Sequence, residues 1–305
     1  MNVAWIWGVA LFFSGGAATF GDESNTRSNR EEEVQRGSDT AKGGFQNEDE
    51  IRDKFNNWKE DQDARAWLEA MNYSPADILE VTASKPHGEK ADVEVRVKTR
   101  IGEHLEGISI KLVSNPHGFN QIDKRWLATY AKKWNMPTDV YESLKLFVGE
   151  LPPVKPSRND QRMFLDELSK ERQKSVREFF TKHRDEIISD LFTGDGEHAA
   201  GWMLVTLKET SSQNQGDTKG PISQRSGDSE QSAEEVASSV RKPRWVIRST
   251  VDAMKLYGDG EVIITHAGSL RIGRVTMQRK GGDNGRESAK MLQFKINPVD
   301  LFELP

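Results

Sequence analysis

The chain has 305 residues, a formal net charge of −5, 35% hydrophobic and 30% charged residues, and no cysteine. This length is enough for one large domain or two ordinary ones. Without cysteine the chain has no disulfide, thiol nucleophile or iron–sulfur cluster, so a metal ion must be bound through oxygen or histidine. No apolar run approaches the roughly 20 residues that cross a bilayer, which excludes an integral membrane protein.

Residues 1–38 are predicted to be a non-globular leader. Residues 1–20 are apolar and end in small residues, as in a secretory signal, but lack the positive charges that begin such signals. Residues 21–38 contain almost no apolar side chains and cannot bury a core. Three interpretations remain open: an export signal, a weak anchor, or sequence upstream of the functional start.

Ordered structure is expected to begin near Asn47, a favourable N-cap followed by Ile51, Phe55 and Trp58 at helical spacing. A helical hairpin is expected to continue through residues 67–71.

The pattern then changes to a period of two, which is typical of strands. Residues 91–98 alternate three valines with Asp92 and other charged residues. After a short turn, residues 108–113 alternate in the same way and carry Ser109 and Lys111 on one face. The two runs predict a β-hairpin in which Asp92 can meet Ser109 and Lys111.

Further elements are expected downstream. An apolar stripe at 126–134 predicts a core helix, 151–156 a proline-rich connector, 163–192 a long helix and 202–207 a buried strand. Residues 210–241 are rich in serine, glutamine, glycine and glutamate, so we expect a disordered insertion there. Strands are expected at 245–247, 262–265, 271–280 and 291–296.

Charge is unevenly distributed along the chain. Residues 22–63 have a local net charge of −6, and residues 266–296 have +5. A basic segment flanked by strands is able to bind a phosphate backbone, although a solvated hairpin commonly has the same composition.

Asp92, Ser109 and Lys111 have the layout of a Mg²⁺-dependent phosphodiesterase. The carboxylate and the backbone carbonyl of Ile110 would hold the metal ion, and the lysine would orient water and stabilise charge on the phosphorane. The motif alone is not specific, because an aspartate followed by Ser-x-Lys often occurs by chance and a lysine on a strand edge is commonly a solubility device.

Two polar segments carry groups that read DNA. Residues 114–124 are dense in amides and bases, which bind base edges and phosphates; a polar loop that caps a helix is the alternative. Residues 278–286 predict a strand pair that could enter a major groove, where arginine or lysine donates to guanine and aspartate accepts from cytosine.

Five segments resemble restriction endonucleases of the HinP group, which cut GCGC, and more remotely MspI, which cuts CCGG. They are 43–51 (GGFQNEDEI), 111–127 (KLVSNPHGFNQIDKRWL), 149–153 (GELPP), 273–288 (GRVTMQRKGGDNGRES) and 291–296 (MLQFKI). The similarity runs from about residue 40 to 304 and is interrupted only by the insertion.

The resemblance implies an α/β PD-(D/E)xK fold, with a mixed central sheet flanked by helices and a C-terminal β-hairpin for DNA recognition. It also implies Mg²⁺-dependent cleavage of both strands within a short GC palindrome, leaving a CG overhang. By position, Asp92 resembles the metal-binding aspartate and Lys111 the catalytic lysine. Ser109 stands where relatives have an amide or a carboxylate; since a hydroxyl is a weaker ligand, the Ile110 carbonyl and Glu48 are expected to compensate.

The resemblance also implies residues that recognise DNA. Gln121 matches the side chain that wedges into the base stack, with Asn115, Asn120 and Lys124 as its neighbours. The matching C-terminal hairpin carries Arg279, Lys280, Asp283, Asn284 and Arg286.

The domain organisation follows from the same match. Residues 39–209 are expected to form the catalytic core with its helical region, and residues 242–305 the C-terminal part of the same domain. Because the similarity does not extend upstream of about residue 37, residues 1–36 are interpreted as lying upstream of the functional start.

The expected setting is a cytoplasmic enzyme with double-stranded DNA as its partner and no membrane contact. A monomer or weak homodimer is expected, with a cognate DNA methyltransferase in the same system. Two alternatives remain: a sequence-specific DNA-binding protein that has lost catalysis through Ser109, and a less specific exported or repair nuclease.

Overall fold

The computed structural model describes residues 42–86, 90–196, 198–208, 245–281 and 286–304. The chain divides into two compact units, Met1–Phe45 and Gln46–Pro305. The described residues of the first unit, 42–45, are helical. The predicted leader, 1–38, and the predicted insertion, 210–241, lie outside the described residues.

The first sheet of the second unit contains the predicted hairpin. Its strands, in spatial order, are β1 (Ile78–Ser84), β2 (Val93–Thr99), β3 (Glu103–Val113), β5 (Trp202–Leu207) and β6 (Trp245–Ser249). β3 pairs antiparallel with β2 and parallel with β5, which makes the sheet mixed. The expected strand at 202–207 is confirmed as an interior strand.

Residues 46–56 and α2 (Gln62–Ala70) supply helical partners for this sheet. The valines of β2 are fully buried and share one core with Phe55 and Trp67. Burial of each such valine contributes roughly 1.5–3 kcal/mol. The helix starts earlier than the expected N-cap at Asn47, so that cap assignment is wrong: Asn47 is inside the helix, where its Oδ1 accepts a hydrogen bond from the Thr206 hydroxyl.

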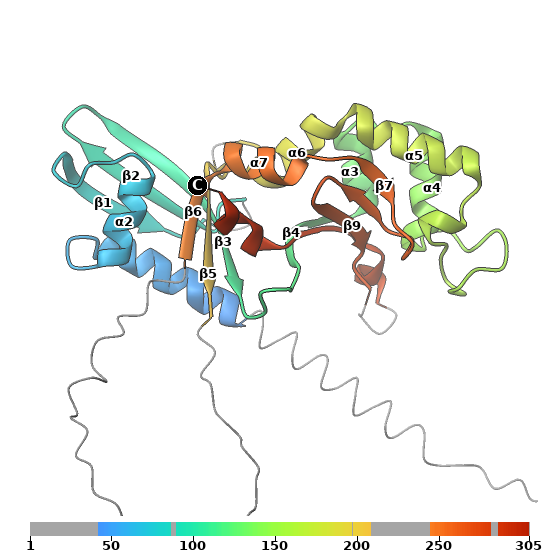
Figure 1. Cartoon of the computed structure of the whole chain (residues 1–305), viewed down its shortest axis with the longest axis horizontal. Helices are drawn as coiled ribbons and strands as arrows, with labels where there is room; N and C mark the ends of the chain where they lie inside the picture. The colour runs from blue at the N-terminus through green and yellow to red at the C-terminus, as the bar shows by residue number, and fades with distance from the viewer. Residues whose placement is uncertain (1–41, 87–89, 197, 209–244, 282–285, 305) are drawn as a thin grey trace, which may run out of the picture. The chain divides into compact units, whose positions relative to one another are not determined.

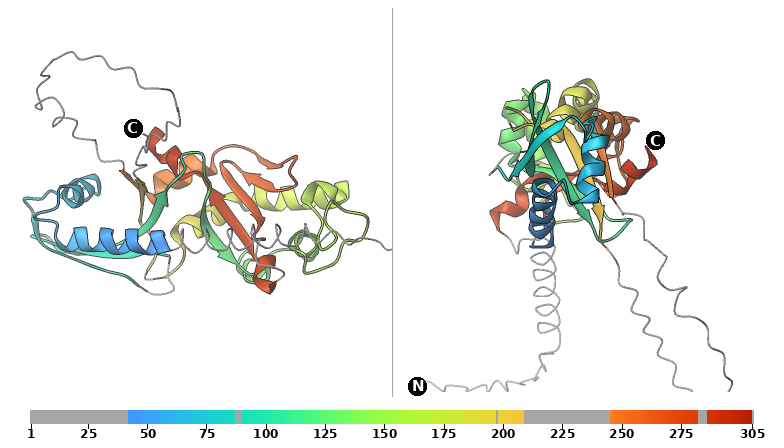
Figure 2. Two further views of the ribbon diagram at one scale, coloured as in Figure 1. Left: turned by 90° about the horizontal axis from the view of Figure 1, so that it is seen from below. Right: turned by 90° about the vertical axis from the view of Figure 1, so that its left-hand side faces the viewer.

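A second sheet lies beside the first (Figures 1 and 2). Its strands, in spatial order, are β4 (Asn120–Arg125), β10 (Leu292–Ile296), β9 (Val275–Arg279), β8 (Leu270–Ile272) and β7 (Val262–Ile264). β9 and β10 form the expected C-terminal hairpin. The strand expected at 271–280 is two strands, because the chain turns at Gly273, where φ is +56° and a Cβ would lie 2.4 Å from the Asp259 carbonyl oxygen.

Helices pack against the second sheet and form a second hydrophobic core with it. They are α3 (Leu127–Lys133), α4 (Thr138–Val148), α5 (Lys170–Lys182), α6 (Arg184–Thr193) and α7 (Thr250–Gly258), with 3₁₀ turns at Leu165–Glu167, Glu287–Lys290 and Pro298–Glu303. The expected single helix over 163–192 is wrong. Leu168 is extended, Ser169 caps α5, and His183 ends α5 and begins α6, so that both helices turn apolar side chains into one core.

The apolar stripe expected at 126–134 is only partly a core. Tyr130 and Trp134 are buried, whereas Trp126 precedes the helix and is 42% exposed. The segment before it is strand β4, which the sequence did not predict.

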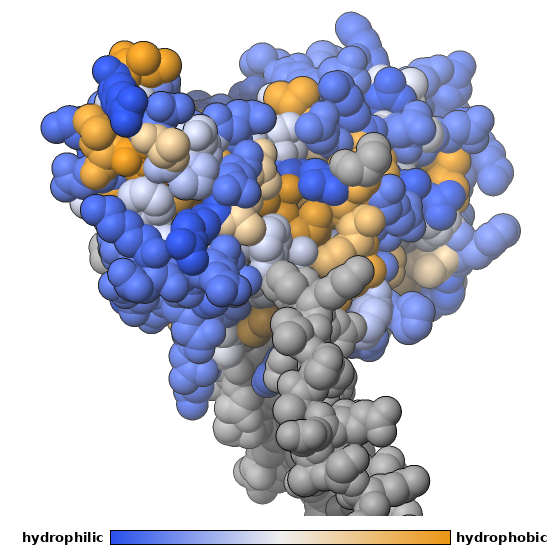
Figure 3. Space-filling model, turned by 60° about the vertical axis from the view of Figure 1, so that its left-hand side comes forward, coloured by the Kyte–Doolittle hydropathy of each residue, from blue (hydrophilic) through white to orange (hydrophobic). Residues whose placement is uncertain are grey.

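The face in Figure 3 is mainly hydrophilic and carries separate hydrophobic patches. In the part of the chain that the structure describes, no helix has both the length and the apolar character needed to span a membrane.

Candidate active site

The candidate site lies where β3 extends past its partner β2. The register of the two strands ends at Val93 and Ile108, so the next backbone groups of β3 face the residue before β2. Asp92 occupies this position: its N–H donates to the carbonyl of Ile108 at 2.9 Å, and its Oδ2 accepts the N–H of Ile110 at 2.6 Å. The end of strand pairing thereby fixes the Asp92 carboxylate.

Lys111 reaches the same place from the adjoining position on β3. Its Nζ lies 3.5 Å from Asp92 Oδ2, 3.2 Å from Ser109 Oγ and 2.8 Å from the Ile110 carbonyl oxygen. Ser109 Oγ donates to Asp92 Oδ2 at 3.3 Å. The structure therefore brings together the three side chains that the alternation of the hairpin predicted to meet.

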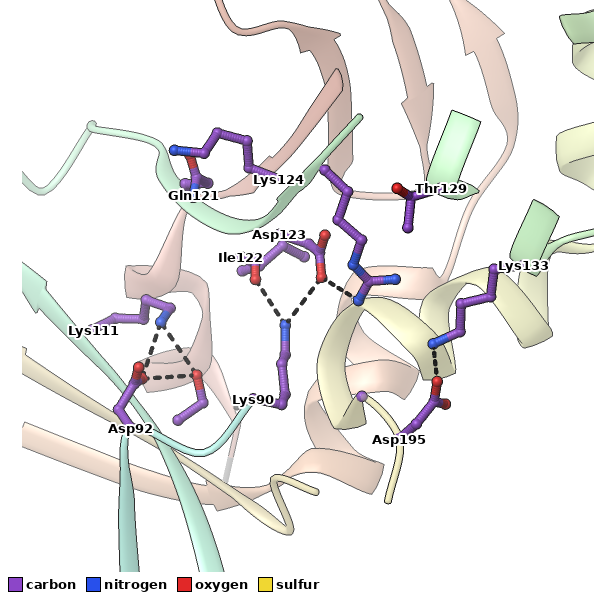
Figure 4. A pocket seen from close by; sticks show the side chains of 13 residues that line it. Lys90, Asp92, Lys111, Gln121, Ile122, Asp123, Lys124, Thr129, Lys133 and Asp195 are labelled. Atoms are coloured by element: carbon purple, nitrogen blue, oxygen red, sulfur yellow. Dashed lines mark hydrogen bonds and ion pairs between the residues drawn. The ribbon is translucent and has the colours of Figure 1, made fainter. Parts of the chain in front are cut away.

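The cluster lines a pocket of 640 Å³ (Figure 4). The other walls come from β4, α3 and the turn that follows α6. Basic side chains line it more heavily than acidic ones: Lys90, Lys111, Lys124, Arg125 and Lys133 against Asp92, Asp123 and Asp195. This excess of positive charge suits an anionic substrate.

The oxygen atoms of the cluster suit a cation. Asp92 Oδ2, Ser109 Oγ and the Ile110 carbonyl all surround the Lys111 ammonium, which shows that they can stabilise positive charge at this point. Carboxylate, carbonyl and water oxygens are the ligands that Mg²⁺ prefers. Among the described residues no group of three or more acidic or histidine side chains is placed to hold a metal, so an ion here would retain several waters.

Glu48 is near this cluster without lining the pocket. Its Oε2 lies 3.0 Å from Lys85 Nζ. Burial raises the pKa of Glu48, as does the charge of Asp92, while Lys85 and Lys111 act in the opposite direction. The pKa of Glu48 therefore depends on the charges of Asp92 and Lys111, although its carboxylate is paired with Lys85.

Two of the predicted recognition residues, Gln121 and Lys124, lie on β4 and line the pocket. Asn115, in the loop before β4, and Asn120, the first residue of β4, do not line it. Asn115 Oδ1 accepts the N–H of His117 at 3.0 Å, and Asn120 Nδ2 donates to the Leu112 carbonyl at 3.0 Å.

The C-terminal hairpin joins the same sheet as β4, because β10 pairs with both β4 and β9. Arg279 Nε donates to the Ala289 carbonyl at 3.0 Å, and burial lowers the pKa of Arg279. Lys280 follows β9, and Arg286 precedes the Glu287–Lys290 turn; neither lines the pocket. Asp283 and Asn284 lie outside the described residues.

Several charged residues of the site were missed from the sequence. Arg125 bridges Asp123 and Asp190 at 2.7 and 2.9 Å, and Lys133 pairs with Asp190 and Asp195. Asp190 and Asp195 lie 57 to 65 residues from Arg125 and Lys133 in the sequence, so spacing gave no signal for these pairs. The alternation of Asp123 and Arg125 on one strand face was the one local indication.

Lys90 is another pocket residue that was missed. Its Nζ donates to the carbonyls of Ile122, at 2.7 Å, and Leu191, and lies 3.8 Å from Asp123 Oδ2. Burial lowers the pKa of Lys90 to about 8, against the opposing effect of the Asp123 carboxylate.

Comparison with known proteins agrees with this architecture. A model of the R.HinP1I restriction endonuclease family matches residues 71–217 and 219–302. The crystal structure of restriction endonuclease MspI in complex with its cognate DNA is similar, with a TM-score of 0.54, 14% sequence identity, and coverage of 91% of this chain and 99% of that chain. This similarity confirms the expected PD-(D/E)xK-like fold. No curated protein matches the chain in sequence.

Proposed function

Since the chain belongs to the R.HinP1I restriction endonuclease family, and is thereby a site-specific deoxyribonuclease, we propose that it cleaves both DNA strands at a short GC palindrome. The proposed target is GCGC, and the proposed product carries a CG overhang. The observation that carries this proposal is the Asp92–Ser109–Lys111 cluster on the wall of a basic pocket, next to the strand that holds Gln121 and Lys124.

We propose Mg²⁺ as the cofactor, held by the Asp92 carboxylate and the Ile110 carbonyl, with Ser109 and Glu48 as weaker contributors. When bound, such an ion would supply polarisation of the phosphate and a more acidic water molecule. Asp92 is oriented by the Ile110 N–H, so its second oxygen remains directed away from that bond. Lys111 orients the attacking water and stabilises the negative charge that develops on the phosphorane.

The proposed substrate is double-stranded DNA, and β4 and the β9–β10 hairpin are its proposed reading surface. Gln121 would wedge into the base stack. Lys124 and Asn120, its neighbours on β4, would contact the DNA beside it, and Asn115 would shape the loop before β4. Arg279, Lys280, Asp283, Asn284 and Arg286 would contact bases and phosphates from the hairpin.

The proposed setting follows from restriction itself. The enzyme would act in the cytoplasm as a monomer or weak homodimer, together with a DNA methyltransferase that protects the same sites. Residues 1–36 would lie outside the functional enzyme, so a chain that lacks them would retain cleavage.

A second candidate function is a sequence-specific DNA-binding protein with weakened catalysis. The observation that favours it is that the cluster offers one carboxylate, from Asp92, while Ser109 supplies only a hydroxyl. A hydroxyl is a poorer ligand for Mg²⁺ than a carboxylate.

Incubation of plasmid DNA with the protein and Mg²⁺, with a chelator as control, separates these functions. Discrete fragments whose sequenced ends fall at GCGC support the proposed enzyme. Discrete fragments that end elsewhere refute the target, a gel shift without fragments supports the binding protein, and a smear indicates a nuclease of low specificity.

A further inference from the structure

Lys90 connects three parts of the site that are distant in the sequence. It lies two residues before Asp92, and its side chain is 13% exposed. Its ammonium donates to Ile122 on β4 and to Leu191 in the last turn of α6. Figure 4 shows Lys90 between the Asp92–Lys111 cluster and the Lys133–Asp195 pair, with its amine directed at β4.

Gly194 is independent evidence that the fold accommodates the Lys90 side chain in this position. It ends α6 with φ of +70°, and a Cβ at this position would lie 2.7 Å from Cβ and 2.9 Å from Cγ of Lys90. Real Cβ atoms essentially never come this close to another heavy atom, so a side chain at 194 would displace the lysine stem. Because residue 194 has no side chain, the Lys90 side chain can extend to the carbonyl oxygens of Ile122 and Leu191.

The segment that carries Asp92 is therefore held at both ends. At one end, the Asp92 backbone N–H donates to Ile108 on β3. At the other, the Lys90 ammonium holds the carbonyl of Ile122, which directly follows Gln121 on β4. A shift of β4 must move this segment or leave a buried ammonium without its oxygen partners, which is strongly unfavourable.

We propose that Lys90 is a positioning residue that couples DNA recognition on β4 to cleavage at Asp92 and Lys111. DNA that fits the reading surface holds β4 in the position at which Lys90 keeps Asp92 aligned with Lys111. DNA with a changed base pair shifts β4. Because Lys90 is hydrogen-bonded to Ile122 on β4, the shift moves Lys90 and with it Asp92, which is then no longer aligned with Lys111. This inference rests on the proposed nuclease function.

The test compares Lys90→Met, which keeps the length of the side chain but removes its charge and donors, with the unaltered protein. Single-turnover cleavage rates and DNA dissociation constants are measured on the cognate duplex and on duplexes with one base pair changed. We expect Lys90→Met to lower the cognate cleavage rate roughly 100-fold, the loss expected when a catalytic group is displaced by about 1 Å. The cognate dissociation constant should change less than about threefold, an effect below 1 kcal/mol, and the ratio of cognate to altered-site cleavage rates should fall.

A second pair of variants keeps Lys90 itself and guards against a folding defect. Gly194→Ala pushes a methyl group against the Lys90 stem, whereas Gly196→Ala also places an alanine at a positive φ, +80°, but with nothing within 4 Å of the new Cβ. Gly194→Ala should reproduce the loss of cleavage rate and discrimination, and Gly196→Ala should not. Thermal melting of each variant reports any general loss of structure.

Two outcomes overturn the inference. The first is that Lys90→Met loses cleavage rate equally on cognate and altered sites and melts at a lower temperature, while Gly194→Ala and Gly196→Ala behave alike. These results together are the behaviour of a purely structural residue. The other is unchanged cognate cleavage in Lys90→Met. An unaltered protein that binds plasmid without cutting it refutes the proposed nuclease function, and the inference with it.

Discussion

Replacement of Lys111 by methionine tests the candidate site most directly. Methionine keeps an unbranched side chain and removes the ammonium that lies 3.5 Å from Asp92 Oδ2. At this distance two unit charges interact by about 5 kcal/mol at an effective dielectric constant of about 20. If the ammonium interacts with the charge of the phosphorane on the same scale, its loss raises the barrier by about 5 kcal/mol, which is a rate loss of about 5,000-fold.

The assay is single-turnover cleavage of a short duplex that contains the target, with DNA affinity measured separately by gel shift. Lys111→Met should lose cleavage while it retains binding. Lys124→Met is the matched control, because Lys124 lines the same pocket from β4; it should weaken binding and leave the single-turnover rate at saturation within about tenfold. Cleavage by Lys111→Met within tenfold of the unaltered protein would refute the assignment of the site.

Three further predictions address two hydrogen-bonded carboxylates, Asp190 and Glu167, and the reading surface. Asp190→Asn should destabilise the fold by about 1–3 kcal/mol in urea denaturation, because it removes the buried carboxylate that accepts from Arg125 and Lys133, although Arg125 keeps its pairing with Asp123; no change in midpoint would contradict this. Although burial opposes its charge, hydrogen bonds from Ser157 and two backbone amides lower the pKa of Glu167 to about 2. The stability that it contributes is therefore complete above about pH 4.5 and is lost as the pH falls toward 2, so urea midpoints of Glu167→Gln should decline less steeply over this range; parallel declines would refute it. Arg279→Ala should weaken DNA binding and relax discrimination by about 1–3 kcal/mol in competition gel shifts, and unchanged discrimination would remove Arg279 from base reading.

Strong local periodicity allowed some elements to be predicted from the sequence and not others. The β2–β3 hairpin was predictable because the valines of β2, which are buried in the core, alternate with charged residues. The boundary at His183 was not, because both flanking helices are apolar at helical spacing and the break serves the packing of the two helices in one core. Strand β4 was also missed, since its pairing with β10 joins residues more than 160 positions apart.

The residues of the candidate site also fall into a predicted group and a missed group. Asp92, Ser109 and Lys111 were predictable because Asp92 directly precedes β2 and the other two lie on its partner β3, where alternation sets which side chains meet. Lys90 and Asp190 were not, because each depends on a contact between β4 and α6, and a lone charged residue in a sequence does not reveal that it will be buried. Their environment exists only once the helix and the second sheet are packed together.

The departure at Ser109 has a physical consequence for the proposed cofactor. The Ser109 side chain is buried, and its hydroxyl donates to Asp92 and accepts from Lys111 at 3.3 and 3.2 Å. Since these two bonds occupy the hydroxyl hydrogen and one lone pair, Ser109 orients its neighbours and has little capacity left to bind an ion. Under the proposed function, Asp92 and the Ile110 carbonyl would then be the main protein ligands of the ion, and water would supply the others. A site with so few protein ligands binds Mg²⁺ more weakly than one with an additional carboxylate, so cleavage should require a higher concentration of the ion.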